Sequence, residues 1–282
     1  MRLFSAGEGF MNLYMAGECE GASEKLCCDN GLLNRLVTFA YKNGGPMKWW
    51  VTERDSSLTP VGSHVFLDCG AFTAHTQGIE IDVVEYAEFI EQHQSVIDVY
   101  AALDVIGNVE STKKNLDVME SRGLRPMPTF HRGSLWSELE RLCERYDSLA
   151  LGGIASEHVG RSLLREWLDG CFAIIKRYWP KHVDGFGIGA QWALERYPFF
   201  SADSTNVIIG GGMGRVLRWD SGKLSASHWS RHARDRLDGS VVDTVSSGSA
   251  YVERVCANCR AMVVFEKHVT KLWTNRGVKW DG

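Results

Sequence analysis

Proline, an excess of one charge and long apolar runs are all scarce in this chain. Its 282 residues include only six prolines, and the formal net charge is −4. No stretch approaches the roughly 18 consecutive apolar residues that span a bilayer. The first residues, MRLFSAGEGFMNLYMAGE, carry Glu8 and Glu18 and lack the apolar core of a secretory signal. We therefore expect a cytoplasmic protein with no membrane partner, and one that is not a uniformly basic nucleic-acid coat.

Linkers are also missing. No Pro-rich, Ser-rich or low-complexity segment divides the chain, so the sequence predicts a single domain over residues 1–282. Eight cysteines are present without an export signal. That combination favours reduced thiols over a disulfide framework.

Short apolar segments alternate with helical patterns along the chain. The expected strands are Asn12–Ala16, Leu36–Ala40, His64–Asp68, Val99–Asp104, Met127–His131, Ser148–Gly152, Val183–Ile188 and Phe199–Asp203. Nearly continuous apolar strands, each followed by a helix, are typical of parallel strands that are buried on both faces. Eight such units predict a (β/α)8 barrel rather than an open doubly wound sheet.

Three helix signatures support this pattern. Asp82 and Glu85 have the spacing of a capping box, and so do Ser137 and Glu140. The segment RSLLREWLDGCFAIIKRYW is amphipathic and should end before Pro180. Near the end of the chain, apolar residues at helical spacing predict a C-terminal helix within residues 249–282.

Polar residues gather where the expected strands end. Asp68, Asp104 and Asp203 each end a strand, and so does His131. Each alone could cap the following helix, because Asp is favoured at caps and in turns. In a barrel, however, the carboxyl ends of all strands meet at one mouth, where active sites lie. We therefore expect these four side chains to share a functional site.

Two carboxylates across a cleft can break a glycosidic bond. One attacks the anomeric carbon, and the other protonates the leaving group and then activates the incoming nucleophile. Asp203, followed by the hydroxyls of Ser204 and Thr205, is expected to stay ionised. Asp68, which lies between apolar residues, is expected to have the raised pKa.

Glycines and aromatic residues follow the same strand ends. Glycines at 70, 152, 153, 185, 187 and 189 would let the backbone approach a flat ligand closely. Phe72 and Phe186 lie just after strand ends and could enclose a planar base. Packing of both rings in the core is the equally weighted alternative.

These residues also carry a family resemblance. FLDCGAF resembles the DSGGF-type motif of the tRNA-guanine transglycosylases, which are (β/α)8 barrels, and AALDV, ALGGIA, GFGIG and FFSADST follow in that family's order. LDVIGN, PMPTFHRG and KLWTNRGVKW look more similar to short phage-type relatives that insert 7-deazaguanines into DNA. The resemblance covers about residue 60 to the end, and it implies the host cytoplasm if a phage encodes the protein.

The resemblance implies a role for each matching position. Asp203 matches the nucleophile and Asp68 the general acid and base. Asp104 matches the acid that binds the base edge, and His131 stands where the family has a glutamine. Gly152, Gly153, Phe72 and Phe186 match the backbone wall and the apolar enclosure of the base. Cys69 replaces the usual serine.

A basic segment follows the expected nucleophile. Residues 211–236 contain six basic side chains against two acidic ones, in a chain with a net charge of −4. We expect a basic loop and helix insertion over 211–248 that binds phosphates, with a solvated face as the alternative. Its candidate nucleic-acid contacts are Arg215, Arg218, Lys223, Arg231 and Arg234.

The sequence weakly suggests one metal site. The related tRNA enzymes bind zinc through three cysteines and a histidine, whereas this chain offers Cys256, Cys259 and the more distant His268. Cysteines three residues apart on a buried helix are more often core residues than ligands, so we expect no zinc and no required cofactor.

Together these observations predict an enzyme that exchanges guanine in DNA for a free 7-deazaguanine base, such as a preQ0-like base. The same exchange on tRNA is the first alternative. A nucleic-acid-binding relative without catalysis and a small-glycoside hydrolase are the others.

Overall fold

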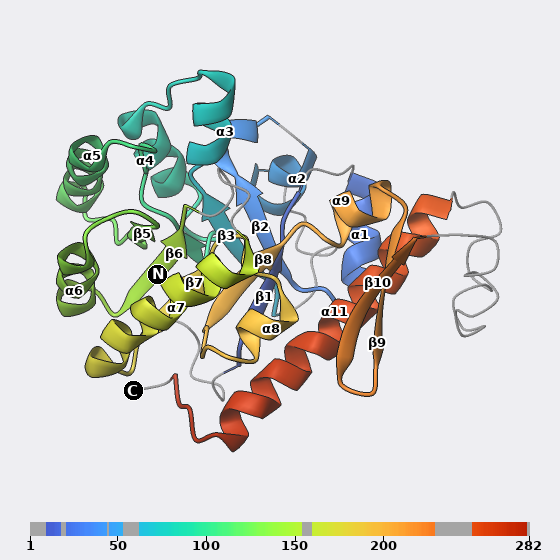
Figure 1. Cartoon of the computed structure of the whole chain (residues 1–282). Coiled ribbons are helices and arrows are strands. Elements are labelled where there is room, and N and C mark those ends of the chain that lie inside the picture. The colour runs from blue at the N-terminus through green and yellow to red at the C-terminus, as the bar shows by residue number, and fades with distance from the viewer. Residues whose placement is uncertain are drawn as a thin grey trace.

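A computed structural model describes residues 10–17, 21–43, 45–52, 62–153, 160–228 and 250–280. Within them, eight parallel strands form one curled sheet with the order β4-β3-β2-β1-β8-β7-β6-β5 (Figure 1). The strands are β1 (Asn12–Met15), β2 (Asn34–Thr38), β3 (His64–Asp68), β4 (Val99–Tyr100), β5 (Thr129–His131), β6 (Ser148–Gly152), β7 (His182–Gly185) and β8 (Ser201–Ser204). This α/β architecture is consistent with a TIM-like barrel.

The two ends of the strand order also touch. A single parallel bridge joins Ala101, just after β4, to Met127, just before β5. The amide of Ala102 donates to the carbonyl of Met127 at 2.8 Å, and the amide of Met127 donates to the carbonyl of Tyr100 at 2.9 Å. The sheet therefore curls until its two edge strands, β4 and β5, meet, although they are joined only by this short bridge.

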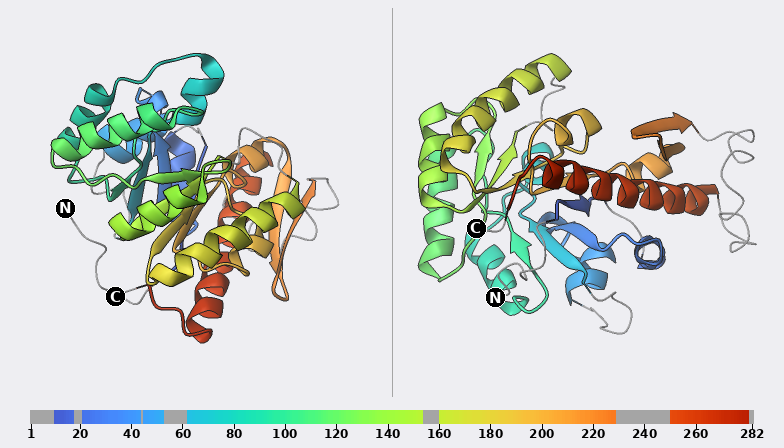
Figure 2. Two further views of the ribbon diagram at one scale, coloured as in Figure 1. Left: turned by 60° about the vertical axis from the view of Figure 1, so that its left-hand side comes forward. Right: turned by 90° about the horizontal axis from the view of Figure 1, so that it is seen from below.

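Helices cover the outside of the sheet (Figure 2). They are α1 (Gly21–Asp29), α2 (Gly45–Met47), α3 (Ala71–Gln77), α4 (Val83–Gln92), α5 (Val109–Ser121), α6 (Trp136–Arg145), α7 (Arg161–Ile175), α8 (Gln191–Leu194) and α9 (Ile208–Gly212). Short 3-10 turns lie at Phe39–Tyr41 and Lys176–Tyr178, and a π turn lies at Lys48–Thr52.

The expected helix boundaries hold at two of three places. Asp82 caps α4, because its carboxylate accepts from the amides of Val84 and Glu85. Helix α7 and its 3-10 extension end before Pro180, as expected. The Ser137 cap was wrong: α6 begins at Trp136, so Ser137 is already inside the helix.

The segment after β8 differs from the expected loop and helix. Strands β9 (Arg215–Asp220) and β10 (Lys223–His228) form an antiparallel hairpin, while residues 229–249 lie outside the described part. The hairpin packs along helix α11 (Ala250–Asn275), and the two lie together beside the sheet in Figure 1. The predicted C-terminal helix is therefore present, joined to the sheet through a β-hairpin.

A buried ion pair connects α1 to the first two strands. The Arg35 guanidinium lies 2.8 Å from the Glu24 carboxylate, and both side chains are at most 1% exposed. Trp50 donates to the same carboxylate at 2.7 Å, and Arg35 donates to the carbonyl of Met15 at 2.7 Å. Each of these buried charges therefore has partners, as stability requires.

Candidate active site

Asp68 ends β3 with its side chain on the inner face of the sheet. The amide of Gly70 donates to its carboxylate at 3.2 Å. Gly70 has φ 86°, and a Cβ there would lie 2.6 Å from the Cβ of Ala40, so this turn requires glycine. Burial raises the pKa of Asp68 to about 6, and the negative charge of Asp104 adds to that rise.

Asp203 lies on the inner face of β8. The amide of Gly187 donates to its carboxylate at 2.7 Å. Burial raises the pKa of Asp203 to about 7, and the charge of Asp68 raises it further in the same direction. Because the charge of Asp68 reaches the Asp203 carboxyl, the two predicted acids share one interior.

Burial raises the pKa of both carboxyls, as expected for Asp68 but not for Asp203. The hydroxyl of Ser204 accepts a hydrogen bond from the amide of Asn206, at 3.2 Å, and the donor to Asp203 is the backbone amide of Gly187. The pKa of Asp203 is therefore raised to about 7 and that of Asp68 to about 6. Side chains next to each other on a strand point to opposite faces, so the Ser204 hydroxyl does not face the Asp203 carboxylate.

Asp104 and His131 form the second polar pair at the strand ends. The His131 ring nitrogen lies 3.1 Å from Asp104 Oδ2. Burial opposes a charge on His131, but the carboxylate outweighs it and the pKa of the imidazole is raised. The other Asp104 oxygen, Oδ1, is buried without a hydrogen-bond partner, as is the nearby hydroxyl of Thr129. Such atoms are costly to bury unless a ligand or water satisfies them.

Gly152 and Gly153 lie beside His131, where the chain has little room for side chains. A Cβ at Gly152 would be 2.9 Å from Thr129 Cγ2, and one at Gly153 would be 3.0 Å from the amide nitrogen of Arg132. Gly153 also has φ 81°, which favours glycine. Both positions therefore require glycine, because neighbouring atoms already fill the space that a side chain would take.

Phe186, Phe72 and Cys69 do not form one enclosure. Phe186 lies in the interior against Phe66, with ring centroids 5.5 Å apart. Phe72 is 44% exposed on α3, and Cys69 is buried in an apolar cluster with Leu67 on the outer side of β3. The structure thus places Phe186 near the carboxyls and Cys69 on the opposite face of the sheet.

Sequence reasoning missed one acid of this interior. Asp184 lies on β7, is 1% exposed and accepts a hydrogen bond of 2.6 Å from the hydroxyl of Ser201. Burial raises its pKa to about 8, and the charges of Asp203 and Asp68 add to the rise. The available signal was the period-two spacing with Phe186 in VDGF, which puts both side chains on one face.

The basic segment is only partly described. Arg215 and Lys223 lie exposed on the hairpin, whereas Arg218 is half-buried. Arg231 and Arg234 lie outside the described residues. Trp219 packs against Phe265 and His268 of α11, with centroids 5.7 and 4.7 Å away, so this ring serves the hairpin contact rather than nucleotide stacking.

The three residues considered as zinc ligands, Cys256, Cys259 and His268, do not form a cluster. Cys256 and Cys259 are buried on α11, and Cys259 shares a hydrogen bond with Cys27. His268 instead contacts Glu195 at 2.9 Å. Among the residues that the structure describes, no cluster of three or more His, Cys, Asp or Glu side chains is arranged to hold a metal ion. That no cofactor is required stays a prediction.

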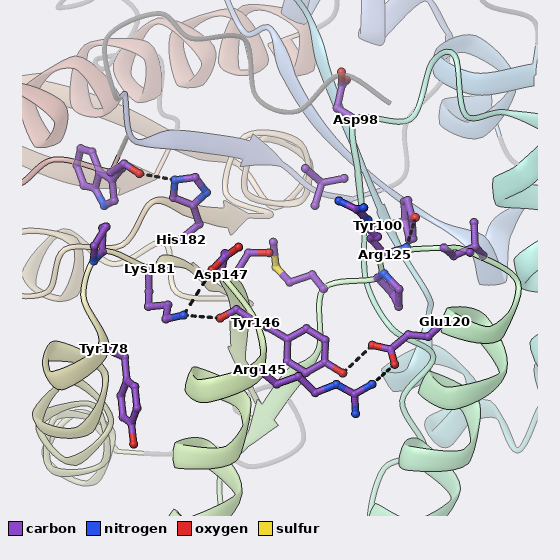
Figure 3. Close-up of a pocket in the computed structure, with 18 residues that line it drawn as sticks. Asp98, Tyr100, Glu120, Arg125, Arg145, Tyr146, Asp147, Tyr178, Lys181 and His182 are labelled. Atoms are coloured by element: carbon purple, nitrogen blue, oxygen red, sulfur yellow. Dashed lines mark hydrogen bonds and ion pairs between the residues drawn. The ribbon is translucent and has the colours of Figure 1, made fainter. Parts of the chain in front are cut away.

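A wide cavity of about 1020 Å3 lies at the opposite, amino ends of β4 to β7 (Figure 3). Its charged groups are already paired: Lys181 donates to the carbonyl of Tyr146 at 2.7 Å, and Glu120 contacts both Arg145 and the hydroxyl of Tyr146. A smaller cavity of about 330 Å3 includes Asp104, His131 and Thr129. Polar atoms of Asp104, Thr129 and His131 lack hydrogen-bond partners at this smaller cavity, although neither Asp68 nor Asp203 lines it.

No family model matches the chain, and no curated protein matches it. In the described residues, no helix has both the length and the apolar character to cross a membrane.

Proposed function

We propose that the protein is a guanine transglycosylase on a (β/α)8 barrel, which exchanges guanine in DNA for a free 7-deazaguanine base. One observation carries this proposal: Asp68 and Asp203 lie on strands far apart in the sequence, yet the charge of Asp68 adds to the raised pKa of the buried Asp203. Two carboxyls that face one cleft are the equipment for replacing one glycosidic bond by another.

The reaction is a double displacement. The Asp203 carboxylate attacks the anomeric carbon and forms a glycosyl ester as the bond to guanine breaks. A proton from Asp68 neutralises the departing guanine. The incoming base then loses a proton to Asp68 and attacks the same carbon, which releases Asp203. Electrons and protons balance without a nicotinamide or a nucleoside triphosphate.

The raised pKa values suit this exchange of roles. A group with a pKa near the working pH can both give and accept a proton at little cost. Asp68, with its pKa raised to about 6, meets that condition. Asp203 must ionise to attack, and the Gly187 amide favours its ionised form.

Base recognition is assigned to the Asp104 end of the interior. The unpartnered Oδ1 of Asp104 can accept from the amino and ring N–H edge of a guanine-like base. His131 Nε2 lies 3.1 Å from Asp104 Oδ2, and the glycine backbone at Gly152 lies beside the His131 ring. Phe186 provides an aromatic surface next to them.

DNA is the proposed polymer, bound along the hairpin by Arg215, Arg218 and Lys223. The anomeric carbon of a stacked nucleotide is hard to reach, so we expect a flipped or single-stranded nucleotide as substrate. Exchange of guanine in tRNA, by the same mechanism, is the alternative to exchange in DNA.

Labelled guanine separates the candidates. We expect the purified protein to incorporate labelled guanine into DNA and not into tRNA. Label in tRNA alone would transfer the proposal to the alternative polymer. Without label in either polymer, the transglycosylase proposal fails, and binding without exchange would support a non-catalytic nucleic-acid-binding protein.

A further inference from the structure

Asp184 is a buried acid to which the two-carboxyl mechanism gives no role. It lies on β7 in register with Ser201 on β8, and Asp203 follows Ser201 two residues later on the same face of that strand. Ser201 donates to Asp184 Oδ1 at 2.6 Å. The other oxygen, Oδ2, is buried and has no hydrogen-bond partner.

This geometry favours a neutral carboxyl. An ionised carboxylate with one unsatisfied oxygen in a dry interior carries a large desolvation cost. The titratable groups that face Asp184 are Asp203 on β8, Asp68 on β3 and Tyr14 on β1, and none of them is cationic. Since Ser201 occupies Oδ1 as a donor, the proton belongs on Oδ2.

We propose that Asp184 is a positioning residue that keeps a proton beneath Asp203 and thereby lets Asp203 carry the negative charge of the nucleophile. Two neighbouring carboxyls in one interior do not ionise together readily, because like charges repel strongly there. While Asp184 is neutral, it adds no second negative charge beside Asp203. Its importance for catalysis rests on the proposed function, whereas its protonation does not.

The expected pH dependence follows from the sign of the shift. Asp184 has its pKa raised to about 8, so it is protonated below that pH and becomes ionised above it. Its negative charge then repels the ionised Asp203 carboxylate and disturbs the buried site that the two side chains share. Exchange by the unaltered protein should therefore fall as pH rises through about 8, by up to roughly tenfold for each pH unit.

Carbon-13 NMR of the aspartate carboxyls tests protonation without reference to activity. The resonance that Asp184→Asn removes should titrate near pH 8. In Asp203→Asn this same resonance should titrate at a lower pH, because the charge of Asp203 contributes to the rise. Titration of the Asp184 carboxyl below pH 5 would overturn the proposal.

Exchange kinetics provide the second readout. Asp184→Asn should retain exchange at pH 6.5 within about twofold and should lose the decline above pH 8, since the amide cannot ionise. Ser201→Ala is the second variant, and it should move the decline to higher pH because the Ser201 hydrogen bond lowers the pKa of Asp184. An alkaline decline that neither substitution alters would refute the proton-holding role.

The two proposals fail in different ways. If the carboxyl titrates near pH 8 but no labelled guanine enters any polymer, the proposed function fails and the protonation of Asp184 stands. If exchange occurs and Asp184 titrates as an ordinary acid, the function stands and the positioning role fails.

Discussion

At the amino ends of the strands, charged side chains have partners, whereas at the carboxyl ends they confront one another. Lys181 and Glu120 are each bonded to neighbouring groups around the cavity of about 1020 Å3. At the other end, the negative charge of Asp68 instead adds to the raised pKa of Asp203. In this protein, buried carboxyls without compensating partners therefore indicate the candidate active site better than the size of a cavity does.

The largest expected difference between the two ends of the strands comes from neutralising the proposed nucleophile. Asp203→Asn should lower exchange by about ten-thousandfold or more, because an amide cannot form the glycosyl ester. Labelled-guanine incorporation measures the loss. The matched control is Asp147→Asn at the opposite end, which should leave the rate within about twofold of the unaltered rate. Equal rates for the two variants would remove the distinction between the ends.

Asp68→Asn should have the second-largest effect. Loss of a general acid and base typically costs about a hundred- to ten-thousandfold in rate. The variant should also lose the alkaline limb of the pH profile that begins near pH 6, because Asp68 must be protonated to assist the departing guanine and burial raises its pKa to about 6. Rates measured from pH 5 to 9 would show this, and an unchanged limb would assign it to another group.

Stability should differ between the two ends as well. For Asp203 and Asp184 the folded pKa values are raised, to about 7 and about 8, above the ordinary value of 3.8. The folded protein thus binds protons more tightly than the unfolded chain, and stability is lost as pH rises from about 4 through 8. Asp184→Asn should remove part of that loss, on the order of a few kcal/mol at pH 8.

Urea unfolding at pH 5 and pH 8 measures this difference. The Asp184→Asn variant should gain stability relative to the unaltered protein mainly at pH 8, while Asp147→Asn should gain at neither pH. A variant that is destabilised equally at both values would show that packing, and not proton binding, dominates at Asp184.

The smallest expected effect concerns the hairpin. Arg215→Ala should weaken DNA binding by about threefold and should make the salt dependence shallower by about one phosphate contact. Fluorescence anisotropy at several salt concentrations measures both. Trp219→Ala should instead lower thermal stability, because this ring packs against Phe265 and His268 of α11. A reversed pattern would assign stacking to Trp219.

The strands of the parallel sheet could be predicted from the sequence because they are short apolar runs that end on polar residues. His64–Asp68 and Ser148–Gly152 agree with the observed β3 and β6 at both ends. The predicted strand Val99–Asp104 pairs as a ladder only over Val99–Tyr100, because its contact with the β5 side shrinks to the bridge at Ala101. Pairing partners are tertiary information that a local pattern does not contain.

The hairpin and Asp184 were missed for different reasons. Ser221 and Gly222, both at positive φ, form the tight turn of the hairpin, and a Ser-Gly pair between alternating residues was an available signal. The basic charge of the segment instead favoured a phosphate-binding loop and helix as its interpretation. Asp184 had weaker signals, since one acid in an apolar strand indicates a function only when its interior neighbours are known.

The most direct test of the central claim is intact-mass analysis of the protein incubated with a guanine-containing DNA oligonucleotide and then denatured by acid. We predict a covalent adduct with the DNA in which guanine has been released, mapped by peptide digestion to Asp203 and lost in Asp203→Asn. An adduct on any other residue, or exchange that proceeds in Asp203→Asn, would contradict the shared work of Asp68 and Asp203 on one sugar carbon.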